Sequence, residues 1–315
     1  MESRQNTYLL LNEGGMWAFT LMILFLLFVS GSVSAEGGPS DTGSATSGQE
    51  YYGLCFSPFF TGENPETGQV LSVATVEERM KLVAPYTGSI RTYSTDGGMA
   101  QAGEIAHRLG LTAAIGIWLG ADPDANEKAI SAGIAVAKNG QADMMIVGSE
   151  TVLRGDLSTE ELIRNIQKVR AGAGGIPVTT AEPHGIWLDH PELIDAVDQV
   201  YVHVYPFWES VDITVAPDFV KERYAEVKAA AGGKSVVISE TGWPKAGSQF
   251  GRAAPSLENA KLYRDKVTAW AAEASVPYYY FEAFDEEWKD NQEGTVGSHW
   301  GVLTTDGHDV FSFSP

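Results

Sequence analysis

Cysteine and basic residues are scarce in this chain. Cys55 is the only cysteine among 315 residues, so the sequence holds neither a disulfide framework nor a cysteine-rich metal site. Lysine and arginine together number 21 against 41 aspartate and glutamate residues, which gives a formal net charge of -20 at pH 7. Because nucleic acids and anionic membranes are bound through basic patches, we expect neither as a partner.

Several motifs of well-known sites are absent as well. The 6 histidines are scattered without an H-E-x-x-H pattern, and no G-x-S-x-G is present, which disfavours a catalytic zinc site and a serine hydrolase. Residues 122–127 (DPDANE) space oxygen side chains like the start of a calcium loop. However, Glu127 stands where that loop needs its glycine, and Gly133 stands where it needs its closing glutamate. We therefore expect neither a metal nor a cofactor.

The first 50 residues are expected to lie outside the fold. Residues 16–29 form an apolar run of the length of a signal-peptide core, short for a membrane span, and residues 32–35 (SVSA) are small enough for cleavage. We interpret residues 1–35 as a signal peptide or, if it is not cleaved, as an N-terminal membrane anchor. Residues 36–50 are rich in Gly, Ser and Thr, which indicates a flexible linker. The prediction is a secreted, periplasmic or cell-surface protein.

From residue 51 onward, predicted strands and helices alternate, which is typical of parallel βαβ units. Strands are expected at 51–57, 89–94, 111–118, 142–149, 177–182, 198–205, 235–240 and 277–284. Helices are expected at 76–83, 99–109, 125–138, 158–171, 191–196, 220–231 and 257–274. This order over residues 51–315 fits one (β/α)8 TIM barrel, an α/β fold. A doubly wound sheet is the alternative, but no G-x-G-x-x-G follows the first strand.

Two of the predicted strands begin as apolar runs and lead into a glutamate. Residues 236–239 (VVIS) lead into Glu240, and residues 144–149 (MMIVGS) lead into Glu150. A carboxylate at the end of a buried strand is costly unless it is paired or protonated. In such barrels the catalytic groups lie at the carboxyl ends of strands, here the fourth and the seventh. We therefore predict that Glu150 and Glu240 form an acid/base pair.

These motifs resemble glycoside hydrolase family 17, the β-1,3-glucanases. Residues 239–244 (SETGWP) look like the nucleophile motif of that family, and residues 147–150 (VGSE) resemble its acid/base motif, which normally reads V-G-N-E. Residues 280–289 (YFEAFDEEWK) and 297–301 (GSHWG) are similar to its last strand and closing loop. The resemblance extends from residue 51 to the C-terminus. It implies retaining hydrolysis of neutral, laminarin-like β-1,3-glucans, with Glu240 as the nucleophile and Glu150 as the acid and then the base.

Further candidates for substrate binding are polar or aromatic side chains at or near the strand ends. They are Arg91, Tyr93, Ser149, Glu182, His203, Tyr205, Trp243, Glu286, Trp288, Lys289 and Trp300. Arg91 and Glu182 could equally be partners in structural ion pairs, whereas the resemblance implies that Glu286 and Lys289 line the cleft. The three tryptophans could pack on top of the barrel. We expect at least one of them to stack on a sugar, because an aromatic face matches the C–H face of a pyranose.

Ser149 is the clearest departure from the family pattern. An asparagine before the acid/base can hydrogen-bond the sugar 2-hydroxyl, a contact that strengthens in the transition state, and serine is short for a direct reach. If this contact is merely lost, Ser149→Asn should raise turnover roughly tenfold. If the site is rebuilt around serine, the larger amide should lower it. Of the two outcomes we favour the first.

Two other functions are compatible with the sequence. A transglucosylase would use the same glycosyl-enzyme intermediate, with a sugar hydroxyl in place of water. A non-catalytic glucan-binding barrel would need neither an acid nor a nucleophile, so the presence of both glutamates argues against it. The sequence distinguishes neither hydrolysis from transfer nor endo from exo action. We expect the protein to be a monomer.

Overall fold

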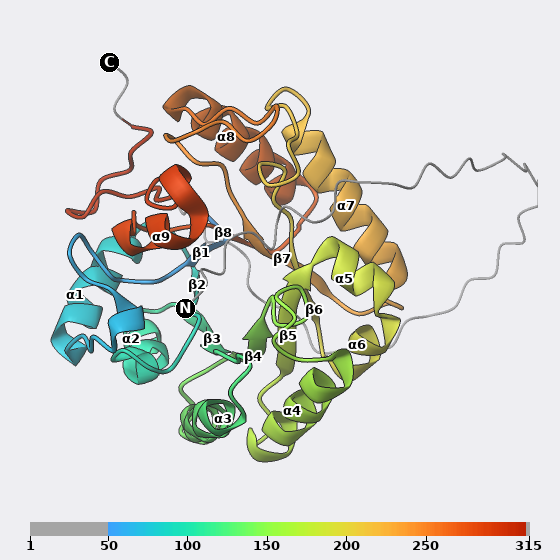
Figure 1. The fold of residues 1–315 in the computed structure, drawn as a ribbon. Coiled ribbons are helices and arrows are strands. Elements are labelled where there is room, and N and C mark those ends of the chain that lie inside the picture. Colours follow the sequence, from blue (N-terminus) through green and yellow to red (C-terminus); the bar gives the residue numbers. More distant parts are fainter. Residues whose placement is uncertain (1–49, 313–315) are drawn as a thin grey trace, which may run out of the picture. The chain divides into compact units, whose positions relative to one another are not determined.

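Eight parallel strands close into a barrel at the centre of the computed structural model, which describes residues 50–312 (Figure 1). The strands are β1 (Gly53–Cys55), β2 (Ser89–Arg91), β3 (Thr112–Ile117), β4 (Met144–Ser149), β5 (Val178–Pro183), β6 (Val200–His203), β7 (Val236–Thr241) and β8 (Tyr278–Tyr280). Each strand pairs in parallel with the next one along the chain, and β1 also pairs with β8. The (β/α)8 TIM barrel predicted from the sequence is confirmed.

The strands are apolar because both of their faces are covered. Every residue of β4 and β7 is buried, since its side chain points either into the barrel or toward the layer of helices. Ile117 of β3 is level with Val147 of β4, and His203 of β6 is level with Glu240 of β7. This register brings the carboxyl ends of neighbouring strands, and the polar residues there, to one rim of the barrel.

Helices surround the barrel (Figure 1). They are α1 (Val73–Val83), α2 (Ala102–Arg108), α3 (Pro123–Lys138), α4 (Thr159–Gly172), α5 (His184–Asp189), α6 (Pro191–Ala196), α7 (Ala216–Ala230), α8 (Leu257–Glu273) and α9 (Asp290–Glu293). Short 3₁₀ turns are η1 (Pro65–Thr67), η2 (Met99–Gln101), η3 (Glu287–Lys289) and η4 (Gly294–Val296). The seven predicted helices are present, whereas the short helices α5 and α9 were not predicted.

Caps and prolines explain why some helices begin earlier than predicted. The side chain of Ser72 accepts a hydrogen bond from the backbone N–H of Thr75 at 3.0 Å, so α1 begins three residues before its predicted start. Pro217 lies in the first turn of α7, where a proline is tolerated because its missing N–H would have no helical partner. Asp122 accepts two backbone N–H groups at the start of α3, so the acidic segment 122–127 begins a helix.

The N-terminal predictions concern a part of the chain that the structure does not describe. The predicted signal peptide or anchor (1–35) and the predicted linker (36–50, except Glu50) lie outside the described residues and stay predictions. Within residues 50–312, no helix combines the length and the apolar composition needed to cross a membrane.

A buried carboxyl group from β5 supports the loop between β4 and α4. Glu182 accepts hydrogen bonds from the backbone N–H groups of Val152 at 2.8 Å and Leu153 at 3.4 Å. Burial is the main reason why the pKa of Glu182 is raised to about 7; the bond from Val152 opposes this rise and the charge of Glu150 adds to it. The carboxyl group therefore holds the loop, but its ionised form is costly in the folded protein.

We expect this cost to appear as a loss of stability when the pH rises. Because the pKa of Glu182 is higher in the folded chain than in the unfolded chain, its contribution to stability is greatest below about pH 4.3 and is lost as the pH passes about 7. A pKa difference of one between the folded and unfolded chains corresponds to about 1.4 kcal/mol, so the loss is on the order of 1–3 kcal/mol. Denaturant unfolding at pH 5 and pH 8 should therefore show that the free energy of unfolding falls less in Glu182→Gln than in the wild type. The glutamine keeps an acceptor for the N–H of Val152.

The exposed Glu160 on α4 provides the control for this measurement. Glu160→Gln changes the formal charge by the same amount, and its stability should follow the wild-type pH profile. Parallel profiles for the wild type and Glu182→Gln would contradict the assignment of the pH effect to Glu182.

Candidate active site

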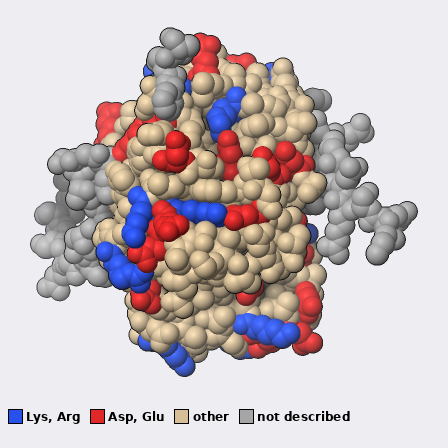
Figure 2. All heavy atoms as spheres, turned by 90° about the vertical axis from the view of Figure 1, so that its left-hand side faces the viewer, with Lys and Arg blue, Asp and Glu red and all other residues tan. Residues whose placement is uncertain are grey.

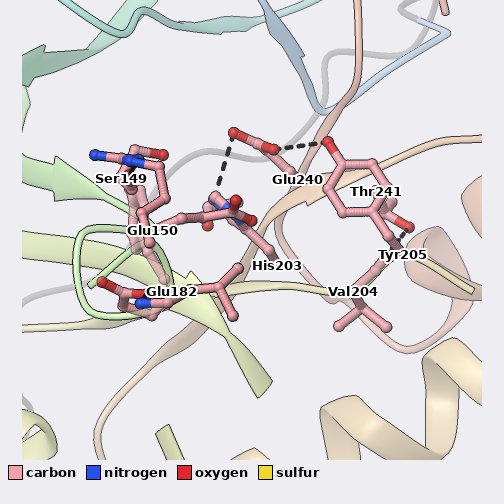
Figure 3. A network of polar contacts seen from close by, with 12 residues as sticks. Ser149, Glu150, Glu182, His203, Val204, Tyr205, Glu240 and Thr241 are labelled. Atoms are coloured by element: carbon pink, nitrogen blue, oxygen red, sulfur yellow. Dashed lines mark hydrogen bonds and ion pairs between the residues drawn. The ribbon is translucent and has the colours of Figure 1, made fainter. Parts of the chain in front are cut away.

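Glu150 and Glu240 meet at the carboxyl end of the barrel (Figure 3). One carboxylate oxygen of each glutamate and a ring nitrogen of His203 all lie within 4.8 Å of one another. The side chain of Glu150 is 18% exposed and that of Glu240 is 8% exposed. The structure therefore brings together the two carboxyl groups predicted to act as a pair, one of them open to solvent and the other largely covered.

Hydrogen-bond donors and positive charges surround Glu240. Its Oε1 forms an ion pair with the Arg91 guanidinium. Its Oε2 accepts a hydrogen bond from the Tyr205 hydroxyl at 2.6 Å (Figure 3). Nε2 of His203 lies 3.4 Å from Oε1. Burial alone would raise the pKa of Glu240, but the charges of His203 and Arg91 and the bond from Tyr205 lower it below its usual value. Glu240 is therefore held as a carboxylate, the form that a nucleophile requires.

Glu150 has a different environment. It follows β4 directly, with a backbone φ of 54°, in the left-handed region that few residues other than glycine adopt. Its Oε1 lies 2.8 Å from Nδ1 of His203. His203 thus lies between the two glutamates with one ring nitrogen toward each. This contact orients the carboxyl group of Glu150 while leaving part of it accessible to a ligand.

Arg91 connects Glu240 to the residue before Glu150. Its Nη2 donates to Oγ of Ser149 at 3.0 Å, and its Nη1 donates to the backbone carbonyl of Ser239 at 2.9 Å. The guanidinium carbon lies 4.8 Å from the ring centroid of Tyr93. Ser149 is therefore buried against an arginine that also holds Glu240. The predicted residues Arg91, Tyr93 and Ser149 all belong to the network beneath the two glutamates.

The three candidate tryptophans differ in how far they are covered. Trp243 and Trp300 are 1% and 2% exposed, and both pack edge-on against Phe207, with ring centroids 5.6 Å and 5.7 Å away. Protein atoms cover their ring faces, so barrel-top packing describes them better than a sugar platform. Trp288 is only half-buried, and its Nε1 donates to Glu286 at 3.0 Å. Of the three, Trp288 alone offers area to a ligand.

A second buried network contains Glu286 and Lys289. Lys289 forms ion pairs with Glu282 and, at 2.7 Å, with Glu286, whose other oxygen accepts a hydrogen bond from Ser57 at 2.6 Å. Burial raises the pKa of Glu282 well above its usual value, although the charge of Lys289 lowers it. Sequence reasoning missed Glu282, yet the signal was present: it follows the apolar strand β8 as Glu240 follows the apolar start of β7.

Glu293 is another carboxyl group near the site that the sequence did not reveal. It accepts a hydrogen bond from Nε1 of Trp300 at 2.9 Å. Burial raises the pKa of Glu293 to about 7, and the charges of Glu240 and Glu150 add to the rise. Because it lies in a polar segment, DNQE, no local pattern distinguishes it from a surface residue. Only the fold brings this segment to the barrel rim.

The site suits a neutral ligand better than a cation. The oxygens of Glu150 and Glu240 and a nitrogen of His203 are close enough to hold a metal ion. However, Oε1 of Glu240 already faces the guanidinium of Arg91, and a second positive charge there would be repelled. On the face of the molecule shown in Figure 2, basic side chains lie among acidic ones and form no continuous patch.

Solved structures with the same barrel include a glycoside hydrolase family 17 enzyme. The β-1,3-glucanosyltransferase of Rhizomucor miehei superposes with a TM-score of 0.74 at 29% identity, covering 83% of this chain and 96% of that one. An active-site mutant of that enzyme, solved in complex with laminaritriose, matches equally well.

Curated relatives cover most of the chain as well. The glucan 1,3-beta-glucosidase of Arthroderma benhamiae is 31% identical over 272 residues, which are 79% of this chain and 87% of the relative. That of Saccharomyces cerevisiae is 26% identical over 276 residues, 78% of this chain and 87% of the relative. The family pattern of the BtgE/BtgC glycoside hydrolase domain matches residues 53–301. This chain therefore belongs to the BtgE/BtgC glycoside hydrolase domain family, within glycoside hydrolase family 17.

Proposed function

We propose that this protein cleaves β-1,3-glucosidic bonds of glucans by double displacement, with Glu240 as the nucleophile and Glu150 as the acid/base. The approach of the two carboxyl groups is the observation that carries the proposal. Their closest oxygens lie within 4.8 Å. Retaining enzymes hold the two groups ~5–5.5 Å apart, whereas inverting enzymes hold them ~6.5–9.5 Å apart to make room for a water molecule. The observed spacing supports retention of the anomeric configuration.

The two environments fit the two roles. In the first step the Glu240 carboxylate attacks the anomeric carbon, the glycosidic bond breaks, and Glu150 gives its proton to the leaving oxygen. In the second step Glu150 takes a proton from water or from a sugar hydroxyl, which attacks the glycosyl-enzyme and releases Glu240. Arg91 and Tyr205 keep Glu240 oriented in both steps, because each holds one of its oxygens.

The relatives support a β-1,3-glucan as the substrate class. Two of them are named glucan 1,3-beta-glucosidases, and the Rhizomucor miehei transferase was solved with laminaritriose. We extend this substrate class to the present chain, together with either water or a second glucan as the acceptor. A neutral polysaccharide also fits the net charge of -20, and an extracellular substrate fits the export predicted from residues 1–35. A binding protein without catalysis would not need this pair of glutamates.

Products formed from laminaripentaose test the proposal directly. We expect the newly formed reducing ends to appear first as the β-anomer, because two displacements restore the starting configuration. Proton NMR of the reaction before mutarotation measures this. Shorter products alone indicate hydrolysis, whereas products longer than the substrate indicate transfer. An initial α-anomer would contradict double displacement, and the absence of any product would contradict the proposed function.

Glu240→Gln should keep the fold but lower turnover by at least ~10³-fold, about 4 kcal/mol of barrier. The amide has the size of the carboxylate and can still accept a hydrogen bond from Tyr205, but it is a poor nucleophile. Turnover is measured on laminaripentaose, and circular dichroism checks the fold. Glu160→Gln, on the exposed face of α4, is the control and should turn over like the wild type. Near-normal turnover by a folded Glu240→Gln protein would remove Glu240 as the nucleophile.

The structure gives a reason to reverse our expectation for Ser149→Asn. The Ser149 hydroxyl is buried and already accepts a hydrogen bond from Arg91 at 3.0 Å, so the site is built around serine. The additional atoms of asparagine would displace the guanidinium from Glu240. We therefore expect turnover to fall about tenfold, or about 1.4 kcal/mol, with the fold unchanged. Steady-state kinetics would decide, and a rise in turnover would show that the serine merely lacks the sugar contact.

A further inference from the structure

Trp118 is an exposed aromatic residue at the carboxyl end of β3. It follows Ile117, the last residue of the strand, and its side chain is 46% exposed. Among the exposed large hydrophobic residues of the described chain it is the only aromatic one. Single exposed apolar residues are common on protein surfaces, so exposure by itself carries no argument. The contacts that hold this ring and its position on the barrel carry the argument instead.

Arg154 covers the ring of Trp118. Its guanidinium carbon lies 4.4 Å from the ring centroid, within the range of a cation–π contact. The arginine is itself fixed, since it donates to the backbone carbonyl of Leu119 at 2.9 Å, pairs with Asp156 at 2.7 Å and contacts the carbonyl of Ser149. The guanidinium therefore cannot leave the ring without breaking these other contacts.

The chain that follows Trp118 is fixed as well. The side chain of Asn126, on α3, donates to the carbonyl of Gly120 at 2.7 Å and accepts a hydrogen bond from its N–H at 2.9 Å. Leu119, which lies between Trp118 and Gly120, is buried. The tryptophan is thus braced through its ring and through its backbone. A ring ordered before binding costs a ligand little conformational entropy.

Trp118 lies on the same rim as the two glutamates. Ile117 is level with Val147, three residues before Glu150. Arg154 belongs to the loop that begins at Glu150, and its backbone N–H donates to the carbonyl of Glu150 at 2.9 Å. Arg91 of β2, His203 of β6 and Tyr205 after β6 contact the two glutamates, whereas Trp118 follows β3. The platform is therefore beside the reacting centre without being part of it.

We propose that Trp118, braced by Arg154, is a stacking platform for a glucosyl unit that lies beyond the bond being cleaved. This inference rests on the proposed function. In a β-glucosyl ring the substituents are equatorial, so each face presents axial C–H groups that pack on an aromatic ring. A contact remote from the bond is made equally in the ground state and in the transition state, so it lowers KM and leaves kcat nearly unchanged. It can act only on chains long enough to reach it.

Chain-length dependence separates a sugar platform from a structural brace. We compare Trp118→Ala and Trp118→Phe with the wild type on laminaribiose, laminaritriose and laminarihexaose. Trp118→Ala should lower kcat/KM for laminarihexaose by tenfold or more, through KM, and change the value for the shortest substrate that is turned over by less than twofold. Trp118→Phe keeps an aromatic face and should retain most of the wild-type value. Equal losses at every chain length, or no loss at any, would overturn the inference.

Trp270 provides a matched control. It is a half-buried tryptophan near the C-terminal end of α8, and this end leads into the amino end of β8, at the opposite face of the barrel. Trp270→Ala loses the contact with Tyr224 and should lower stability without any chain-length effect.

Binding to a protein that does not turn over keeps this test separate from the proposed function. In the Glu240→Gln background, calorimetry should show that Trp118→Ala weakens laminarihexaose binding at least tenfold and laminaribiose binding less than twofold. A wild-type protein that binds laminarihexaose through Trp118 but forms no product would contradict the proposed catalysis and support the platform. Equal affinities with and without Trp118 would contradict the platform, whatever the activity.

Discussion

The ion pair between Arg91 and Glu240 is the contact on which the site depends. Both side chains are almost fully buried, and an unpaired charge at that depth would cost several kcal/mol. Arg91 extends from β2 to Glu240 of β7 and also hydrogen-bonds Ser149 of β4. One guanidinium therefore joins three strands at the end of an apolar barrel. Because the barrel fixes these strands, it also fixes the orientation of Glu240, the proposed nucleophile.

Glu150 is positioned by other means. Whereas Glu240 lies within a strand, Glu150 begins a loop. The Glu182 carboxyl group holds that loop, and the loop's own Arg154 ties it to the carbonyls of Ser149 and Leu119. His203 contacts both glutamates, one with each ring nitrogen. The two carboxyl groups are therefore close together but in different environments. This is the condition for one to act as an acid while the other stays ionised.

The sequence was sufficient to predict the barrel, its eight strands and the two facing glutamates. The barrel and its strands follow from the alternation of apolar, strand-length runs with helical segments, and the two glutamates follow from a local pattern, an apolar run that leads into a carboxylate. The exposure of aromatic residues could not be predicted, since it depends on which residues from distant loops pack against them. Trp243 and Trp300 look like platforms in the sequence and are covered by Phe207 and its neighbours. Trp118 is also a tryptophan beyond the end of a strand, and it is exposed.

The strands β4, β7 and β8 show why one pattern does not fix one role. Glu150, Glu240 and Glu282 each lie at or just after the end of an apolar strand. Glu240 faces the Arg91 guanidinium, the His203 ring and the Tyr205 phenol, and its pKa is lowered, so that it is held ionised. Glu282 is sealed inside the protein, where burial raises its pKa although Lys289 is adjacent.

Glu150 differs from both because it is partly open to solvent, and it shares His203 with Glu240. An acid/base must give its proton to a leaving group and then take one from an incoming hydroxyl, so it needs access to solvent, and Glu150 is the most exposed of the three. The partners and exposure of each carboxyl group, which only the folded chain determines, therefore distinguish the three glutamates and support the proposed roles.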